Sequence, residues 1–285
     1  MAVQTGKSPI NTTVAQLCDR YDALFFDAFG VLLDRSGPLP GARETISRLN
    51  REGKPYWVLS NSAARLPQTM ASDFAVLGLP VPAEHIITSG TLLSAHFQAC
   101  GLTGCRCLVL GPDDSQQLCR MAGGDVVPLH AGDTAEVIVI ADQKGFDMLA
   151  GMDRALTTAL RRLDSGSPLH VVLCNPDLIY PQAELQYGFT AGALALMLEG
   201  VLRERYPEQS YTFARLGKPY GPIFEEAMAR AGTRRVVMIG DQLATDILGA
   251  NRAGIDSALV MSGLAHPAHL QPSPARPTYL LPNLL

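Results

Sequence analysis

The sequence lacks a long apolar run: none of its 285 residues belongs to a stretch of the roughly 18 apolar residues that a membrane-spanning helix needs. Segment 1–11 is polar, without the apolar centre of a secretory signal. Positive charge is not in surplus either, because the formal net charge is -4, which disfavours binding to a nucleic-acid backbone. We therefore expect a cytoplasmic protein without membrane or nucleic-acid partners.

Paired cysteines are also missing. The six cysteines are scattered, and only Cys105 and Cys107 lie close together. Their C-x-C spacing has no second pair and no histidine ligands, so a zinc site is disfavoured. The sequence predicts reduced, mostly buried thiols.

What the chain does contain is an alternation of apolar strand-like and helical segments. Residues 23–27 and 56–59 are expected strands, and the apolar spacing within 42–52 predicts a helix between them. Such a βαβ unit places the ends of both strands at one edge of a parallel sheet. Segment 34–41 is rich in turn residues, and we expect no regular structure there.

The alternation predicts an α/β fold: a Rossmann-like, three-layer core with a parallel sheet, plus an inserted smaller α/β cap domain. A chain of this length favours about two domains of roughly 100–200 residues each. We expect the core at 1–100 and 207–285 and the cap at 101–206. A strand at 212–216 is expected to resume the first sheet, and the proline-rich tail to lie extended along the core.

Polar residues recur at the ends of the apolar strands. Asp27 ends the first strand, Ser60 and Asn61 follow the second, Lys218 follows a later strand, and Asp241 with Asp246 follows another. Alone, each has an ordinary explanation as a helix cap, a helix-dipole partner or a solvated charge. Together at one sheet edge, they suit an anion held by a cation, a hydroxyl and backbone N–H groups.

In this order, these residues resemble the four motifs of the haloacid dehalogenase-like (HAD) hydrolase superfamily. The interval between Asp27 and Ser60 is too short for a cap domain, whereas the interval from Ser60 to Lys218 is long enough, which resembles class IIA members. Residues 174–181, which begin Cys-Asn-Pro-Asp, resemble the Asn-Pro-Asp signature at the end of their caps.

The resemblance implies a mechanism and a cofactor. Asp27 would be the nucleophile that forms an aspartyl-phosphate. Mg²⁺ would be bound by Asp27, the backbone carbonyl of Phe29 and Asp241, with Asp246 steadying the site. The following residues would bind phosphate or substrate: Ser60, Asn61, Lys218, Asn175 and Asp177. Structural roles in a turn are open for Asn175, Asp177 and Tyr180.

One position departs from the family pattern. Most phosphatases of the superfamily carry a second Asp two residues after the nucleophile, as the general acid and base, and here that residue is Phe29. A phenyl ring transfers no proton, and such catalysis contributes on the order of 10²–10⁴-fold. Asp34 is one candidate substitute, although a loop-capping role suits it better.

The leading hypothesis is a Mg²⁺-dependent phosphatase of a small phosphorylated metabolite, such as a sugar phosphate. An aromatic residue at position 29 also resembles haloacid dehalogenases, although these carry their cap earlier in the chain and need no metal. A phosphometabolite-binding protein with impaired catalysis is the third reading. The sequence does not identify the substrate, and it leaves open whether the protein forms a homodimer.

Overall fold

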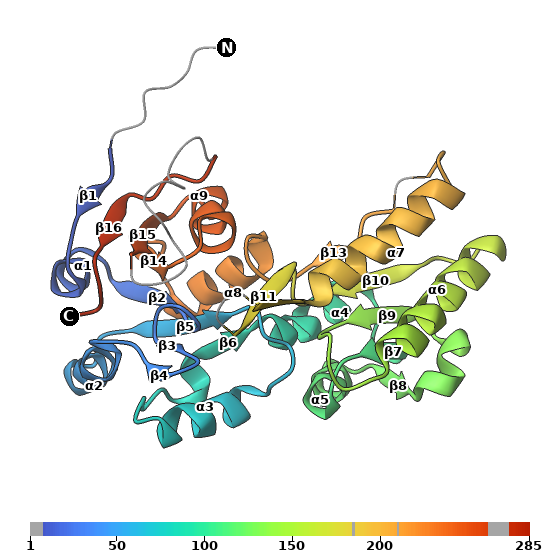
Figure 1. The fold of residues 1–285 in the computed structure, drawn as a ribbon, viewed down its shortest axis with the longest axis horizontal. Coiled ribbons are helices and arrows are strands. Elements are labelled where there is room, and N and C mark those ends of the chain that lie inside the picture. The colour runs from blue at the N-terminus through green and yellow to red at the C-terminus, as the bar shows by residue number, and fades with distance from the viewer. Residues whose placement is uncertain (1–7, 184–185, 210, 262–273) are drawn as a thin grey trace, which may run out of the picture. The chain divides into compact units, whose positions relative to one another are not determined.

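The computed structural model describes residues 8–183, 186–209, 211–261 and 274–285. The chain divides into two compact units. The first comprises Met1–Ser60, Met70–Ile87 and Phe224–Leu285, and the second comprises Asn61–Thr69 and Thr88–Ile223. Both are α/β structures, as the sequence predicts (Figure 1). The core and cap boundaries at 101 and 206 stay a prediction.

A seven-stranded sheet forms the centre of the first unit, in the order β1-β16-β15-β14-β2-β5-β6. From β1 to β5 in this order, neighbouring strands pair in parallel. The strands are β1 (Ile10–Asn11), β2 (Ala23–Asp27), β5 (Tyr56–Ser60), β6 (Ile86–Thr88), β14 (Val236–Gly240), β15 (Asp256–Val260) and β16 (Tyr279–Leu281). The central strand β2 is buried throughout, which explains its uninterrupted apolar run.

Helices cover this sheet. They are α1 (Val14–Arg20), α2 (Ala42–Glu52), α3 (Pro67–Val76), α8 (Gly221–Ala231) and α9 (Leu248–Ala253). Apolar side chains of α1, α2 and α3 share one core with alternate residues of β2, β5 and β14. A smaller cluster packs Ile247 and Leu248, where α9 begins, against Leu259 of β15. Alternate strand residues therefore face different helices, as in a three-layer fold.

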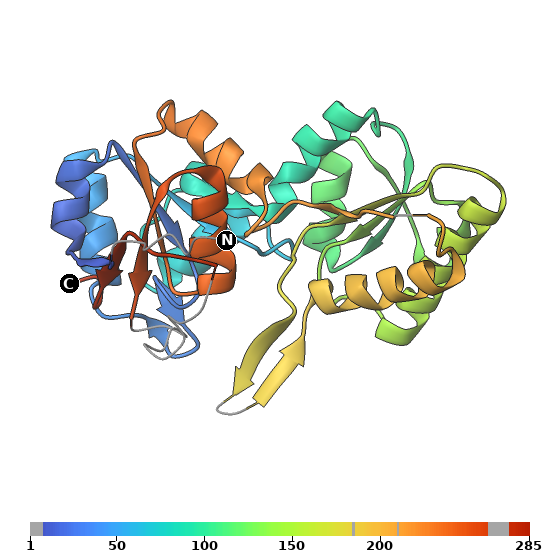
Figure 2. The same cartoon turned by 90° about the horizontal axis from the view of Figure 1, so that it is seen from above.

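The second unit is built on a five-stranded parallel sheet in the order β13-β10-β9-β7-β8. Its strands are β7 (Arg106–Leu110), β8 (Asp125–Val127), β9 (Val137–Ile140), β10 (His170–Leu173) and β13 (Ala214–Arg215). Its helices are α4 (Leu93–Cys100), α5 (Asp113–Met121), α6 (Met148–Asp164) and α7 (Ala191–Arg205). In Figure 2, α6 and α7 lie on one side of this sheet and α4 and α5 on the other. Side chains of α6 and α7 share one apolar cluster with residues of β7, β9 and β10.

Some expectations about local structure were wrong. The strand expected at 212–216 does not resume the first sheet, because β13 pairs with β10 in the second. Segment 34–41 is not wholly irregular, since β3 (Leu33–Asp34) and β4 (Gly37–Pro38) form a small antiparallel hairpin. The predictions also omitted strands β1, β8 and β16 and the hairpin of β11 (Ile179–Ala183) and β12 (Gln186–Phe189), which projects as two yellow arrows in Figure 2.

Two predictions about whole classes of residue can be checked on the described parts of the chain. All six cysteines are free, but only Cys107, Cys119 and Cys174 are buried, so thiols are less buried than expected. Among the described helices, none is both long enough and apolar enough to cross a membrane.

Candidate functional site

Strand β2 delivers Asp27 to the carboxyl edge of the first sheet. Its register with β5 places Asp27 opposite Leu59, so Ser60 follows at the same edge. This confirms that Asp27 and Ser60 end adjacent parallel strands. The Asp27 side chain is only 6% exposed, and its Oδ1 accepts a hydrogen bond from Ala28 N over 2.8 Å. That bond fixes the direction of a carboxylate at a strand end, where α/β sheets bind ligands.

Strand β14 delivers the other two acids. Asp241 directly follows β14, the neighbour of β2, and is fully buried. Asp246 lies in a π-helical turn, Leu243–Ile247, and is also fully buried. Its Oδ2 accepts a hydrogen bond from Gln242 N over 3.1 Å. The π-turn lies immediately before α9, and such turns are frequent at functional sites.

The structure brings Asp27, Asp241 and Asp246 together. Each contributes one carboxylate oxygen to a group whose atoms all lie within 4.8 Å of one another. Three buried carboxylates at this spacing repel one another and lose hydration, so a cation is the usual compensation. Oxygen-only ligands suit hard divalent cations such as Mg²⁺. These acids form the one cluster of potential ligands of three or more His, Cys, Asp or Glu residues found among the described residues.

Two glycines allow this close packing of carboxylates. A Cβ atom at Gly30 would lie 2.3 Å from Asp241 Oδ2, and a Cβ at Gly240 would lie 2.2 Å from Asp246 Cβ. Gly30 also has φ +94°, which L-residues with side chains rarely adopt. A side chain at either position would enter the space of the acids. The residues present therefore fit a small divalent cation.

The turn after Asp27 carries the atypical residue. Phe29 is 40% exposed, and Gly30 N donates to Leu33 O over 2.7 Å to close the turn. Asp34 Oδ1 accepts hydrogen bonds from Ser36 N over 2.7 Å and from Ser36 Oγ over 2.5 Å. The Ser36 hydroxyl holds the pKa of Asp34 below its ordinary value. These contacts favour the loop-capping interpretation of Asp34 over that of a proton donor.

A second group of predicted residues meets in the second unit. Lys218 is only 2% exposed and Asn61 only 7% exposed. Asn61 Oδ1 accepts a hydrogen bond from Lys218 N over 2.7 Å, and Asn61 Nδ2 donates to Lys218 O over 3.0 Å. The sequence interpretation considered only the backbone of Asn61, and its side chain was missed because no residue pattern signals so distant a partner.

Asn175 and Asp177 lie in the same neighbourhood. Asn61 Nδ2 donates to Asp177 Oδ1 over 2.9 Å. Asn175 Oδ1 accepts a hydrogen bond from Asp177 N over 3.0 Å, which closes an Asx-type turn. Burial raises the pKa of the adjacent Cys174 thiol to about 12, so this cysteine behaves as a neutral apolar residue. Substrate contacts of Asn175 and Asp177 stay predictions.

A cavity of about 580 Å³ lies within the second unit, and none of the predicted site residues lines it. Its lining includes Ser62, which follows Asn61 in the chain, and side chains of both charges, among them Arg65, Asp142 and Lys144. Asp142 is buried, and burial raises its pKa above the ordinary value. Lys144 also lies over the ring of Tyr180, 5.5 Å from its centroid. The sequence interpretation did not identify this cavity.

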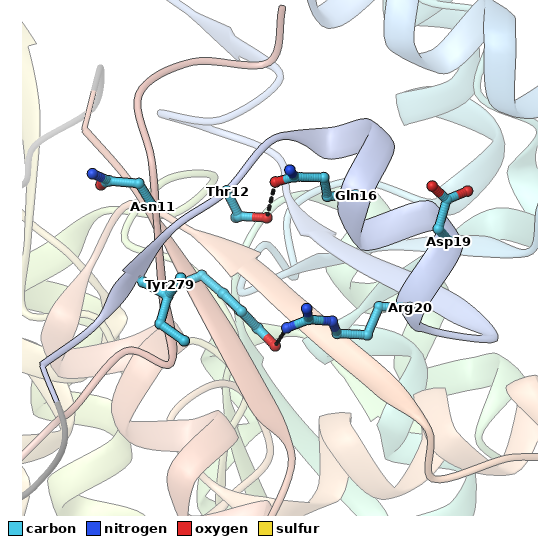
Figure 3. A pocket seen from close by; sticks show the side chains of 7 residues that line it. Asn11, Thr12, Gln16, Asp19, Arg20 and Tyr279 are labelled. Atoms are coloured by element: carbon cyan, nitrogen blue, oxygen red, sulfur yellow. Dashed lines mark hydrogen bonds between the residues drawn. The ribbon is translucent and has the colours of Figure 1, made fainter.

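Another cavity, of about 450 Å³, lies in the first unit beside α1 (Figure 3). Its polar side chains bind one another: Arg20 Nη1 donates to Tyr279 Oη over 2.6 Å, and Thr12 Oγ1 donates to Gln16 Oε1 over 3.2 Å. Tyr279 also lies 2.9 Å from the hydroxyl of Tyr21. None of the predicted site residues lines this cavity, and its hydrogen bonds tie α1 to β16.

Two models of known protein families match this chain. A family model described as haloacid dehalogenase-like hydrolase matches residues 24–125, and a second, described as HAD-hydrolase-like, matches residues 215–285. Together they span more than half of the chain and include Asp27, Ser60, Lys218, Asp241 and Asp246.

Individual proteins are similar over most of the chain. The dihydroxyacetone phosphatase of Corynebacterium glutamicum is 25% identical over 90% of this chain and 87% of its own length. A structure from Cytophaga hutchinsonii, described as a possible sugar phosphatase of the HAD superfamily, is 28% identical with a TM-score of 0.81, covering 97% and 99% of the two chains. The glycerol phosphate phosphatase of Mycobacterium tuberculosis, in complex with calcium, is 25% identical with a TM-score of 0.77, covering 94% and 75%.

Proposed function

This chain belongs to the haloacid dehalogenase-like hydrolases, in their class IIA branch, and we propose that it is a phosphatase that hydrolyses the phosphoric monoester of a small metabolite. The observation that carries the proposal is the buried cluster of Asp27, Asp241 and Asp246 at neighbouring strand ends. Two of the similar proteins are named dihydroxyacetone phosphatase and glycerol phosphate phosphatase, and these names support a small substrate for this chain.

The proposed reaction has two steps at Asp27. A carboxylate oxygen of Asp27 attacks phosphorus, the bond from phosphorus to the ester oxygen breaks, and its electron pair leaves with that oxygen. Water then attacks the phosphorus of the aspartyl-phosphate, which releases inorganic phosphate and restores the carboxylate. The leaving oxygen takes its proton from solvent or from a donor other than residue 29, because Phe29 has none.

Other residues of the chain would hold the phosphoryl group. The Ser60 hydroxyl, the Asn61 backbone N–H and the Lys218 ammonium group offer hydrogen bonds and positive charge to its oxygens. Asp27, the Phe29 carbonyl and Asp241 would bind Mg²⁺, and Asp246 would support them. When bound, Mg²⁺ would neutralise the charge of the acids and of the phosphoryl oxygens.

The cavity that Ser62 helps to line supports a substrate whose organic portion carries hydroxyl groups. Its charged walls, with Arg65, Asp142 and Lys144, offer hydrogen-bond donors and acceptors to hydroxyl groups. A small polyol or sugar phosphate suits such walls better than a large apolar ester. We therefore expect triose, glycerol and short sugar phosphates to be better substrates than simple alkyl phosphates that lack hydroxyl groups.

The test is phosphate release from p-nitrophenyl phosphate and from a panel of these metabolites, with Mg²⁺ and with a chelator. Wild type should release phosphate only with the metal, and Asp27→Asn should release none. Borohydride added during turnover should convert Asp27 to homoserine, detected by mass spectrometry, because it reduces an acyl phosphate. No phosphate release from any substrate by wild type and by Phe29→Asp would reject the proposal and favour a binding protein. Chloride release from 2-haloacids without metal would favour a dehalogenase.

A further inference from the structure

The side chain of Asn61 holds the backbone of Lys218 on both sides, through Lys218 N to Oδ1 at 2.7 Å and Nδ2 to Lys218 O at 3.0 Å. The same Nδ2 donates to Asp177 Oδ1 at 2.9 Å. We propose that Asn61 is a positioning residue that orients Lys218 toward the phosphoryl group, and that Asp177 orients Asn61. The identity of what Lys218 binds rests on the proposed function, whereas the positioning does not.

The chemistry of the amide explains why asparagine suits this position. A carboxamide presents an acceptor and a donor side by side, which matches the N–H and C=O of one residue. Asn61 and Lys218 are both almost completely buried. Water therefore cannot replace these hydrogen bonds readily, and loss of the amide leaves buried backbone groups unsatisfied.

The residue before Lys218 is fixed as closely. A Cβ atom at Gly217 would lie 2.6 Å from Asn61 Oδ1 and 2.7 Å from Pro176 Cδ. Gly217 N also donates to Cys174 O over 3.2 Å. Glycine is therefore needed for the chain to pass between Asn61 and the 174–176 segment. The backbone at 217–218 is held by the Asn61 amide and by the turn that begins at Cys174.

Backbone position matters for this lysine because its ammonium group sits on a flexible four-carbon stem. An error of about 1 Å in the placement of a charged group can cost on the order of 10²-fold in rate. Asn61 is also a predicted phosphate ligand through its own N–H. One residue would thus present its backbone to the phosphoryl group and use its side chain to place a second ligand.

A control for these hydrogen bonds lies elsewhere in the chain. Asn251 holds Arg276 in the same manner in the first unit, with Asn251 Nδ2 donating to Arg276 O over 3.0 Å and Arg276 N donating to Asn251 Oδ1 over 2.8 Å. Asn251→Ala removes a hydrogen-bond pair of the same pattern, at an exposed position, from a residue without a proposed role in the reaction. It reports what the loss of such an asparagine side chain does far from the proposed site.

A double-mutant cycle between Asn61 and Lys218 is the first test. Asn61→Ala should lower kcat/KM and the affinity for inorganic phosphate by about 10–100-fold. In a Lys218→Ala background the same change should cost less than about threefold, because the group being positioned is gone. Asn251→Ala should cost less than about threefold in both backgrounds. An equal loss with and without the Lys218 ammonium group would overturn the inference.

The second test needs no activity. Lysine acetylation by acetic anhydride, followed by peptide mass spectrometry, should be about tenfold faster at Lys218 in Asn61→Ala than in wild type, because its local structure opens. Lys54, whose Nζ donates to Cys18 O over 2.6 Å, is the internal control and should not change. Faster labelling of Lys218 in a protein without phosphatase activity would retain this inference and reject the proposed function. Unchanged labelling would reject the inference.

Three further variants distinguish positioning from misfolding and from a direct role of Asp177 in substrate binding. Asn61→Asp keeps the acceptor for Lys218 N but loses both donated bonds, so it should show a loss in the same direction. Asp177→Asn retains an acceptor for Asn61 Nδ2, so acetylation of Lys218 should proceed at the wild-type rate, whereas in Asp177→Ala it should be as fast as in Asn61→Ala. Acetylation of Lys218 as slow in Asp177→Ala as in wild type would contradict the role of Asp177 as the partner of Asn61.

Discussion

Gly30 and Asp241 approach so closely that a single methyl group at residue 30 would lie 2.3 Å from Asp241 Oδ2. Asp241 is fully buried and shares the acidic cluster with Asp27 and Asp246. The glycine that lets the chain turn after the proposed nucleophile therefore also makes room for a proposed metal ligand. This relationship joins two motifs that lie far apart in the sequence.

Replacing Gly30 with alanine should displace the Asp241 carboxylate. We expect Gly30→Ala to lower the free energy of unfolding by about 2–4 kcal/mol, because strain at positive φ adds to the steric conflict. Magnesium affinity, measured by calorimetry, should fall at least about tenfold because a ligand has moved.

Gly37→Ala is the matched control for this change. Gly37 has φ +122°, but an added Cβ there meets no atom within 4 Å. Gly37→Ala should therefore cost about 1–2 kcal/mol from the backbone alone and leave magnesium affinity unchanged. Equal magnesium affinities in the two variants would contradict the role of Gly30 as the space for Asp241.

Removing one charge from the acidic cluster should have opposite effects with and without metal. Asp241→Asn relieves repulsion among three buried carboxylates, so the metal-free variant should unfold at a higher temperature than metal-free wild type. Added Mg²⁺ should raise the melting temperature of wild type, by linkage of binding to folding, but not that of the variant. An unchanged melting temperature of the wild type in millimolar Mg²⁺ would refute the metal site.

The sequence was informative wherever local chemistry determines structure. Strand 23–27 and helix 42–52 have the predicted bounds, because an apolar run and a regular helical spacing specify them. The acids at the ends of β2 and β14 could be placed at one edge from the direction of parallel strands alone. The grouping of these two acids with Asp246 was implied by the resemblance to HAD hydrolases, and the three carboxylates lie together in the structure.

Long-range partners were outside the reach of that reasoning. The two-residue strand β13 pairs with β10 in the second sheet. That pairing depends on tertiary contacts, and the sequence around 214 does not show them. The hydrogen bonds of Asn61 with Lys218 and Asp177 likewise join residues far apart in the chain. Only the folded backbone shows that the Asn61 amide and the Lys218 peptide group face each other.

The partly buried His85 should make stability depend on pH. It packs edge-on against Tyr56, with ring centroids 4.7 Å apart, and desolvation holds its pKa below the ordinary value of 6.5, against an opposing effect of Glu84. The unfolded chain therefore binds the proton more readily. Stability from this group is complete above about pH 6.5 and is lost as pH falls below it.

We expect His85→Phe to reduce this acid sensitivity. Urea unfolding at pH 7.5 and pH 5.5 should show a smaller difference in the free energy of unfolding for the variant than for wild type. Burial lowers the pKa of His96 in the same direction, so some sensitivity should remain. Parallel losses in wild type and His85→Phe would show that His85 does not contribute.

Phe29 determines which phosphate esters the proposed enzyme can hydrolyse well. An alkoxide leaving group needs a proton as the ester bond breaks, whereas p-nitrophenolate leaves readily without one. Phe29→Asp should therefore raise kcat/KM for glycerol phosphate by about 10–100-fold and change that for p-nitrophenyl phosphate by less than about threefold. The 40% exposure of Phe29 leaves room for a solvated carboxyl group at this position.

The same variant decides whether Asp34 supplies the proton in wild type. Because Ser36 binds the Asp34 carboxylate and lowers its pKa, Asp34 is ionised at neutral pH and has no proton to donate. Asp34→Asn should thus leave the ratio of alkyl to aryl phosphate activity unchanged, both alone and combined with Phe29→Asp. If Asp34→Asn instead abolished alkyl phosphate hydrolysis in the otherwise wild-type protein, and the added change Phe29→Asp restored it, Asp34 would be the general acid of the wild type. Equal gains on both esters in Phe29→Asp would show that residue 29 acts on something other than the leaving group.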